Sequence, residues 1–152
     1  GALSRSQDIL LQSDLGVLPL KQIVEMETAS FADRIRSEGS NVLVGAQGAQ
    51  NFVLLLHELT TNAIKYGALR SEAGVVDVCW DVTGDGRFTF RWKEKCEPVV
   101  RTGERSGFGT SLLKSLFPES LCRMEIETDG LVYELNAPLS ALGAAQDGMS
   151  VG

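Results

Sequence analysis

Apolar side chains recur between residues 47 and 66 at the spacing of an amphipathic helix, the longest regular pattern in the chain. At about 100° per residue, one broad side of this helix would hold Phe52, Leu55, Leu56, Leu59, Ala63 and Ile64. Gly67 follows directly and predicts a left-handed cap at the helix end. A shorter helical pattern spans residues 20–32 after Pro19, a residue suited to a first helical turn. Its inward side chains would be Leu20, Ile23, Val24, Met26 and Phe31.

Runs rich in β-branched and aromatic residues predict strands in the rest of the chain. In chain order, the candidates are residues 34–39, 41–45, 75–82, 87–94, 120–128 and 131–138. The segment TGDG joins the third strand to the fourth, and Asp129-Gly130 joins the last two. Both connections are typical of tight hairpins. A short helix is expected at residues 110–117, closed by Pro118.

This order of elements predicts an α/β two-layer sandwich, with one mixed, mostly antiparallel sheet and the helices on one of its faces. With 152 residues, the chain has the length of one domain. We expect the folded domain to cover residues 17–139. Residues 140–152 are small and glycine-rich, which predicts a disordered tail.

Composition narrows the class of protein. The net charge of −6 and the lack of a basic stripe argue against nucleic-acid binding. Cys79, Cys96 and Cys122 are odd in number and contain no Cys-x-x-Cys pair, which favours reduced thiols in a cytoplasmic protein over disulfides or a zinc site. The longest apolar runs are far shorter than a membrane span, so this segment is expected to make no membrane contact.

The segment HELTTNAIKYGAL contains the only histidine and a line of polar side chains on the long helix. Glu58, Asn62 and Lys65 lie within about 60° of one another, opposite the apolar side, whereas His57 lies about 100° from Glu58. Such a line is most often only a solvated face. It is also the donor set that nucleotide-bound magnesium prefers, because Mg²⁺ takes few protein ligands and shares phosphates and water. A Ser-His-Asp or Cys-His mechanism fits poorly, since no nucleophile motif accompanies His57.

Two further segments could contact a nucleotide. Gly107 and Gly109 lead into the predicted short helix, and a glycine-rich helix start attracts anions, although a flexible turn explains the pattern equally well. Trp92 and Glu94 lie on the same face of a strand. A Trp there is usually core packing. An inward Glu needs a hydrogen-bond donor, and the exocyclic amine of an adenine would be one.

Together, these segments resemble the ATP-binding domain of the GHKL superfamily, which has the Bergerat fold. Within it, the chain resembles the HWE family of bacterial sensor histidine kinases, named for a histidine in the helical asparagine box and a Trp-x-Glu in the following box. HELTTNAIKYGAL carries the first with His57, and Trp92-Lys93-Glu94 carries the second. GFGTSLL is similar to the phosphate-side glycine box. The resemblance extends from about Leu20 to Pro138.

The resemblance implies a domain that binds ATP and Mg²⁺. The intact kinase would transfer the γ-phosphate to a histidine and then to the receiver domain of a response regulator. Asn62 would bind the magnesium, and Glu58 would hold it through water or act as a base toward the acceptor. Glu94 would accept a hydrogen bond from the adenine amine. The other implied nucleotide contacts are Lys65, Tyr66, Arg105, Gly107, Phe108, Gly109 and Thr110, the last four at the end of a mobile lid. His57 and Trp92 mark the family.

Two features depart from the family pattern. Lys95, Cys96 and Glu97 stand where family members have glycines, which would stiffen the loop beside the nucleotide. His57 is not expected to be the phosphorylated histidine, so the acceptor would come from histidine-bearing dimerisation helices. Residues 1–16 resemble a remnant of the second helix of that hairpin.

Two alternatives stay open at this point. A degenerate GHKL domain could act as a phosphotransfer or docking scaffold without binding ATP, and the altered loop at residues 95–97 would then be its trace. A GHKL ATPase of the chaperone or mismatch-repair type fits less well, because those proteins lack the Trp-x-Glu signature.

Overall fold

A computed structural model describes residues 17–97, 116–117, 120–127 and 129–143. The elements, in chain order, are β1 (Val17–Pro19), α2 (Leu20–Glu27), the 3-10 turn η1 (Ala29–Phe31), β2 (Ile35–Gly39), β3 (Leu43–Gly45), α3 (Ala46–Tyr66), η2 (Ala68–Arg70), β4 (Val75–Val82), β5 (Arg87–Lys95), β6 (Leu121–Glu127), β7 (Gly130–Pro138) and η3 (Leu139–Leu142).

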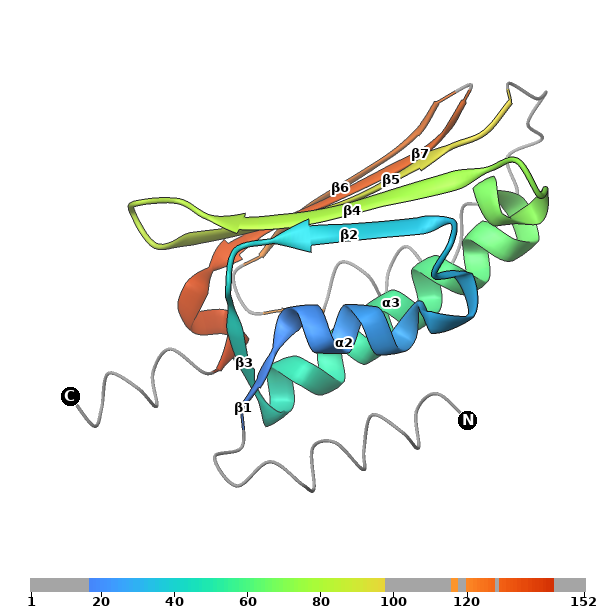
Figure 1. Cartoon of the computed structure of the whole chain (residues 1–152). Helices are drawn as coiled ribbons and strands as arrows, with labels where there is room; N and C mark the ends of the chain where they lie inside the picture. The colour runs from blue at the N-terminus through green and yellow to red at the C-terminus, as the bar shows by residue number, and fades with distance from the viewer. Residues whose placement is uncertain (1–16, 98–115, 118–119, 128, 144–152) are drawn as a thin grey trace.

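A five-stranded sheet forms one layer of the fold, in the order β2-β4-β5-β7-β6. β2 runs parallel to β4, and every other neighbouring pair is antiparallel. Helices α2 and α3 both lie against one face of this sheet (Figure 1). The predicted two-layer α/β sandwich and both predicted hairpins are therefore confirmed.

Aromatic packing fixes α3 against the sheet. Phe52 is completely buried, and its ring centroid lies 5.9 Å from that of Phe88, 5.8 Å from that of Phe90 and 4.8 Å from that of Phe117. Edge-on and tilted aromatic pairs at such distances add about 0.5–1.5 kcal/mol each beyond simple burial. The helix that carries the polar line is thus a rigid support whose opposite side is buried.

The N-terminal part differs from its prediction. Pro19 is the last residue of β1, a strand that pairs antiparallel with β3 in a separate two-stranded sheet. The two short predicted strands therefore belong to different sheets. α2 ends at Glu27, where the Thr28 hydroxyl donates to the Val24 carbonyl at 2.7 Å. Phe31 consequently lies in η1 and is only partly buried.

Three local predictions were wrong. Ile64 was expected in the core but is 43% exposed, because it lies at the edge of the apolar side of α3. Gly67 has φ −127°, so the helix does not end in a left-handed cap, although the Gly67 N–H still donates to the Ala63 carbonyl. The described fold also continues past residue 139, because η3 buries Leu142 completely. Ser140, where the tail was predicted to start, lies inside this turn.

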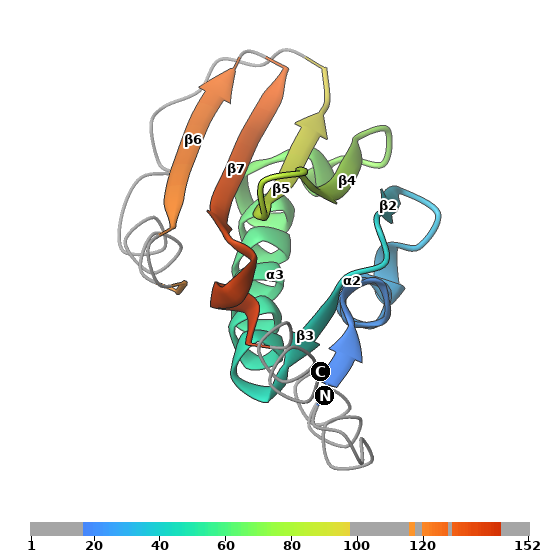
Figure 2. The same ribbon diagram turned by 90° about the vertical axis from the view of Figure 1, so that its left-hand side faces the viewer.

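The view along the molecule shows α3 beneath β5 and β7, with α2 beside it on the β2 side (Figure 2). The C-terminal end of α3 lies near the start of β4 and the end of β5 (Figure 1). This arrangement brings the end of the histidine-containing segment next to Trp92 and Glu94.

Candidate functional site

The predicted polar line forms one continuous ridge on α3. Glu58 and Asn62, one helical turn apart, are half-buried, whereas Lys65 and Tyr66 at the helix end are exposed. His57 is also exposed. Its position about 100° from Glu58 leaves it off the ridge. The structure therefore separates the family-marking histidine from the side chains predicted to hold magnesium and phosphate.

Asn51 extends the ridge toward the start of the helix, since it lies about 20° from Glu58 around the helix axis. Its Nδ2 donates to the Leu116 carbonyl at 2.7 Å, and its Oδ1 accepts from Gln47 at 3.2 Å. Leu116 is the first described residue after the glycine-rich segment. The polar ridge thus lies on the side of α3 that binds Leu116.

Trp92 and Glu94 form a buried hydrogen-bonded pair on the inward face of β5. Trp92 is fully buried and Glu94 is 1% exposed. The Trp92 Nε1–H donates to Glu94 Oε2 at 3.0 Å, and the Ala68 backbone N–H donates to Glu94 Oε1 at 3.1 Å. The protein itself therefore supplies donors to both carboxylate oxygens. The predicted need of this inward Glu for a donor is met by the protein, and the adenine contact stays a prediction.

Arg34 binds the connection between α3 and β4, which contains Ala68, on the side opposite Glu94. Arg34, between η1 and β2, donates from Nε to the Gly74 carbonyl at 3.0 Å and from Nη2 to the Ala68 carbonyl at 3.2 Å. Nη2 also donates to the Ser71 carbonyl. The guanidinium thus donates hydrogen bonds to three backbone carbonyls of the segment that follows α3. Ala68 is bound at its N–H by Glu94 and at its carbonyl by Arg34.

Two of the residues that replace the family's glycines, Lys95 and Cys96, make polar contacts with neighbouring elements. Lys95 pairs with Asp77 on β4 at 3.1 Å, and the Cys96 N–H donates to the Asp129 carbonyl at 2.7 Å. The chain therefore leaves β5 along the β6–β7 turn. Lys95 and Cys96 are thus bound to β4 and to the β6–β7 turn. That the missing glycines stiffen this loop stays a prediction.

Five predicted contacts fall outside the described residues. They are Arg105, Gly107, Phe108, Gly109 and Thr110. Their assignment to the phosphates and the lid stays a prediction, as does that of residues 1–16 to a dimerisation helix.

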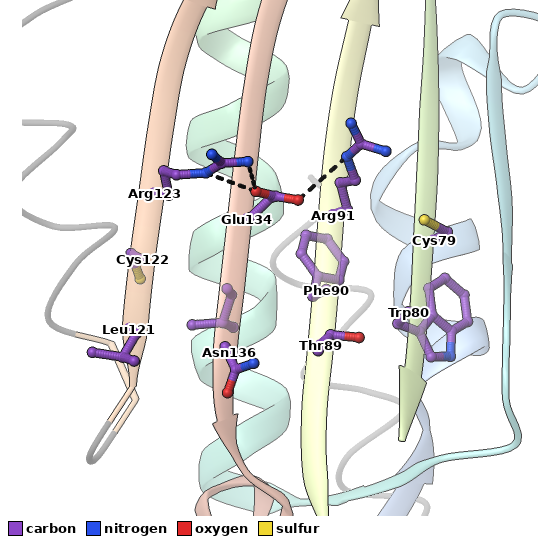
Figure 3. Close-up of a pocket in the computed structure, with 11 residues that line it drawn as sticks. Cys79, Trp80, Thr89, Phe90, Arg91, Leu121, Cys122, Arg123, Glu134 and Asn136 are labelled. Carbon is purple, nitrogen blue, oxygen red and sulfur yellow. Dashed lines mark hydrogen bonds and ion pairs between the residues drawn. The ribbon is translucent and has the colours of Figure 1, made fainter. Parts of the chain in front are cut away.

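A hollow of about 490 Å³ lies on the other face of the sheet, away from the helices (Figure 3). At its centre, Glu134 pairs with Arg91 at 3.5 Å and with Arg123. The hydrogen bond from Arg123 to Glu134 raises the pKa of the guanidinium further. Burial raises the pKa of the Cys79 thiol at the rim. None of the predicted site residues that the structure describes lines this hollow.

The ridge offers suitable oxygen donors for magnesium. Glu58 and Asn62 supply a carboxylate and an amide oxygen one turn apart, and nucleotide phosphates and water would complete the octahedron that Mg²⁺ requires. No set of three or more His, Cys, Asp or Glu side chains in the described part of the chain is placed to bind a metal without such a ligand. Within the same residues, no helix has the length and apolarity to span a membrane.

Sequence reasoning missed Arg34 and Ala68. A backbone N–H has no signature in the sequence. Arg34 lies in a strand candidate far along the chain from its partners, and the parallel pairing that brings them together is a long-range feature. The only available signal was the need of a buried Glu for donors.

Comparisons with known proteins agree with the fold. No protein-family model matches the chain. The blue-light-activated histidine kinase of Brucella anthropi is 39% identical over 150 residues, which cover 92% of this chain but 30% of that protein. The protein of the same name from Brucella ovis is 36% identical over 149 residues, with the same 30% of its length covered. The chain thus spans about a third of the length of the curated relatives it matches.

A solved structure with a similar fold is the histidine kinase domain of the Erythrobacter litoralis EL346 blue-light-activated histidine kinase. Its TM-score is 0.70 at 16% identity, covering 94% of this chain and 74% of that one. The catalytic domain of the histidine kinase ThkA matches with a TM-score of 0.60 at 14% identity, covering 80% and 93%. At these identities, the structural similarity concerns the fold, while the Brucella relatives carry the sequence relationship.

Proposed function

We propose that this chain, which belongs by sequence and fold to the histidine kinase family, is the part that binds Mg-ATP and presents its γ-phosphate to a histidine on another segment. The intact protein would be an HWE-type kinase that passes the phosphate to a response regulator. Phosphoryl transfer needs little covalent chemistry from the protein. It depends on in-line positioning and on the neutralisation of phosphate charge.

The observation that supports this proposal is the ridge on α3. Asn62 and Glu58 offer the oxygen atoms that would hold magnesium, and Lys65 offers a cation one turn further on for the phosphates. Asn51, on the same ridge, bonds the chain where it returns from the glycine-rich segment. A helix that is buried on one side and polar on the side that binds the Leu116 carbonyl is suited to an anionic ligand.

The residues here would hold and orient the reactants. Magnesium supplies charge neutralisation when it is bound with the nucleotide. Glu58, half-buried beside Asn62, could accept a proton from the incoming acceptor or hold a metal-bound water. Lys65 is exposed and free to reach phosphate oxygens. The acceptor histidine is expected on helices outside the ridge, because His57 projects away from it.

One substitution tests this assignment. Asn62→Ala removes a predicted metal ligand from a half-buried position outside the core, so the fold should persist. Affinity for Mg-ATP should fall by at least about tenfold, because even outer-shell partners of metals are worth 10–100-fold. Titration calorimetry of Mg-ATP into the 152-residue chain measures the change. Asn41→Ala, at an exposed asparagine between β2 and β3, is the matched control. Equal affinity of the wild type and Asn62→Ala would contradict the placement of the metal.

A scaffold function is the second candidate, and the burial of Glu94 is the observation that favours it. A carboxylate at 1% exposure with two protein donors serves a structural purpose even if no nucleotide binds. The same titration separates the two functions. If the wild-type chain gives no heat with millimolar Mg-ATP, the scaffold reading is supported and the kinase reading fails for this chain.

A further inference from the structure

We propose that β6 is an interaction surface for a second copy of this chain, in which the two β6 strands pair antiparallel about a two-fold axis at Met124. This inference goes beyond the proposed function and does not depend on it. β6 is the outermost strand of the five-stranded sheet, beside β7 (Figure 2). Among the described residues, no strand pairs with its other side. A strand in this position presents a row of backbone N–H and C=O groups that another strand can pair with.

The side chains of β6 are accessible to a partner. None of the residues of this strand is buried, whereas most of the residues of β7 are. Leu121 is 70% exposed and Ile126 is 44% exposed, although both are large and apolar. The two side chains lie on opposite faces of the sheet, because the face alternates at each residue. A strand added at this edge would therefore cover apolar surface on both faces.

The charged residues of β6 restrict the register that a second copy can adopt. Arg123, Glu125 and Glu127 are exposed and share one sheet face. Like charges that lie directly opposite one another destabilise a ladder, and charges on edge strands commonly prevent pairing for this reason. A two-fold axis at Arg123 would place the two Arg123 side chains opposite one another. An axis at Glu125 would do the same with two carboxylates, so both registers are disfavoured.

A two-fold axis at Met124 gives the opposite result. It places Arg123 of each copy opposite Glu125 of the other, so this register contains two ion pairs and no pair of like charges. On the other sheet face, Met124 meets its own counterpart and Cys122 meets Ile126, so these pairs are apolar. The strand is therefore complementary to itself in this register and repels itself in the two registers beside it.

The contacts within one copy are compatible with this exchange. Arg123 Nη1 lies 3.1 Å from Glu125 Oε1 of its own strand, and both side chains are largely exposed. An exposed ion pair contributes little to stability, so Glu125 can turn toward Arg123 of the other copy. Arg123 also contacts Glu134 on β7, which the pairing leaves in place. A seven-residue strand pairing is smaller than the standard interface of about 1,600 Å², so the dimer is weak and reversible.

Sedimentation equilibrium of the 152-residue chain tests the proposal at concentrations up to about 1 mM, where weak contacts are populated. The average mass of the wild type should rise from 16.4 kDa toward twice that value. Arg123→Glu and Glu125→Arg should each raise the dissociation constant by about tenfold, because like charges would then meet at two symmetry-related positions. Arg91→Glu is the matched control and should associate like the wild type, since Arg91 also pairs with Glu134 but lies on β5, inside the sheet.

A mixture of the two variants tests the register itself. Arg123→Glu and Glu125→Arg chains present opposite charges at both positions when they pair with one another, so their equimolar mixture should associate like the wild type. General attraction would not explain this result, because each substitution changes the net charge of −6 by only two and both variants stay negative. A mixture that associates no better than either variant alone, while circular dichroism shows both to be folded, would overturn the proposal.

The wild type provides a measurement that does not depend on the folding of any variant. On dilution from about 1 mM, the amide resonances of residues 121–127 should shift in NMR spectra, and those of β2 at the opposite edge of the sheet should stay in place. A wild type that stays monomeric over this range, or one that associates with shifts confined to other residues, would contradict the assignment of β6 as the interface.

Discussion

Neighbouring strands bury two polar side chains in different ways. The carboxyl group of Glu94 on β5 accepts hydrogen bonds from Trp92 and Ala68. Tyr133 on β7, opposite Trp92, is 1% exposed, and its hydroxyl lies 3.4 Å from the Cys122 sulfur. A buried charge is tolerated only where hydrogen bonds replace water, whereas a buried phenol can remain neutral. The buried site of Tyr133 therefore disfavours the ionised form of its hydroxyl.

Tyr133 makes the stability of the fold depend on alkaline pH. Burial, with a smaller contribution from Cys122, raises the pKa of Tyr133 well above its ordinary value. Above about pH 10, the unfolded chain loses this proton and the folded chain keeps it, so the unfolded state binds fewer protons and stability falls as pH rises. The loss should approach about 1.4 kcal/mol per pH unit from this residue alone.

Urea unfolding of the wild type and of Tyr133→Phe, at a series of pH values from about 8 to about 11, measures this contribution. Below about pH 10 the difference in stability between the two proteins should be constant, and above it the wild type should lose stability faster. Parallel curves over the whole range would mean that Tyr133 ionises in the folded protein as it does in the unfolded chain.

At the scale of the element, the connection between α3 and β4 is held by hydrogen bonds from Arg34 and to Glu94. Gly74→Ala would place a methyl group 1.8 Å from the Ala68 oxygen, against backbone that Arg34 and Glu94 hold on both sides. We expect a loss of about 1–3 kcal/mol of unfolding free energy, as for other overpacked sites. Chemical denaturation measures the loss.

Gly84→Ala, in the β4–β5 turn, is the control for Gly74→Ala. A Cβ at Gly84 meets nothing within 4 Å. Its stability should be unchanged or slightly increased, because alanine lowers the entropy of the unfolded chain. Equal effects of the two substitutions would show that the close approach of Gly74 to Ala68 does not constrain the loop.

The elements that sequence predicted correctly are those with local signals. α3 has apolar residues at helical spacing over many turns, and the β4–β5 and β6–β7 hairpins have turn sequences typical of tight hairpins. β1 was missed because three residues ending in proline have no period to detect. The parallel pairing of β2 with β4 was not specified either, since it depends on tertiary contacts across α3.

Within the site, too, the features set by local spacing were predictable from the sequence, whereas long-range contacts were not. The spacing of Glu58, Asn62 and Lys65 placed them on one ridge, and the alternation of β5 placed Trp92 and Glu94 on one face. What spacing could not supply was the partner of each group. The Glu94 donors include a backbone N–H from the end of α3, and only the packed fold brings that atom to β5.

At the scale of the molecule, the proposed function raises the question of which histidine would receive the phosphate. The chain spans 30% of the length of the Brucella relative and has one histidine in its sequence. A kinase domain that docks onto a separate acceptor needs its own surface free of a competing nucleophile near the phosphate. His57 would not compete as an acceptor, because it is exposed and lies off the ridge that carries Asn62.

The last prediction follows from that geometry. The 152-residue chain incubated with Mg²⁺ and γ-³²P-labelled ATP should remain unlabelled, and His57→Gln should behave identically. A separately produced histidine-bearing helical segment of a related kinase should become labelled in trans when the wild-type chain is added, and should not when Asn62→Ala is added, since the metal would no longer hold the phosphates in line. Acid-labile label on the segment, separated by gel electrophoresis, measures transfer. Label on the chain itself that disappears in His57→Gln would instead make His57 the acceptor, and would require the phosphate to lie on the side of α3 away from the ridge.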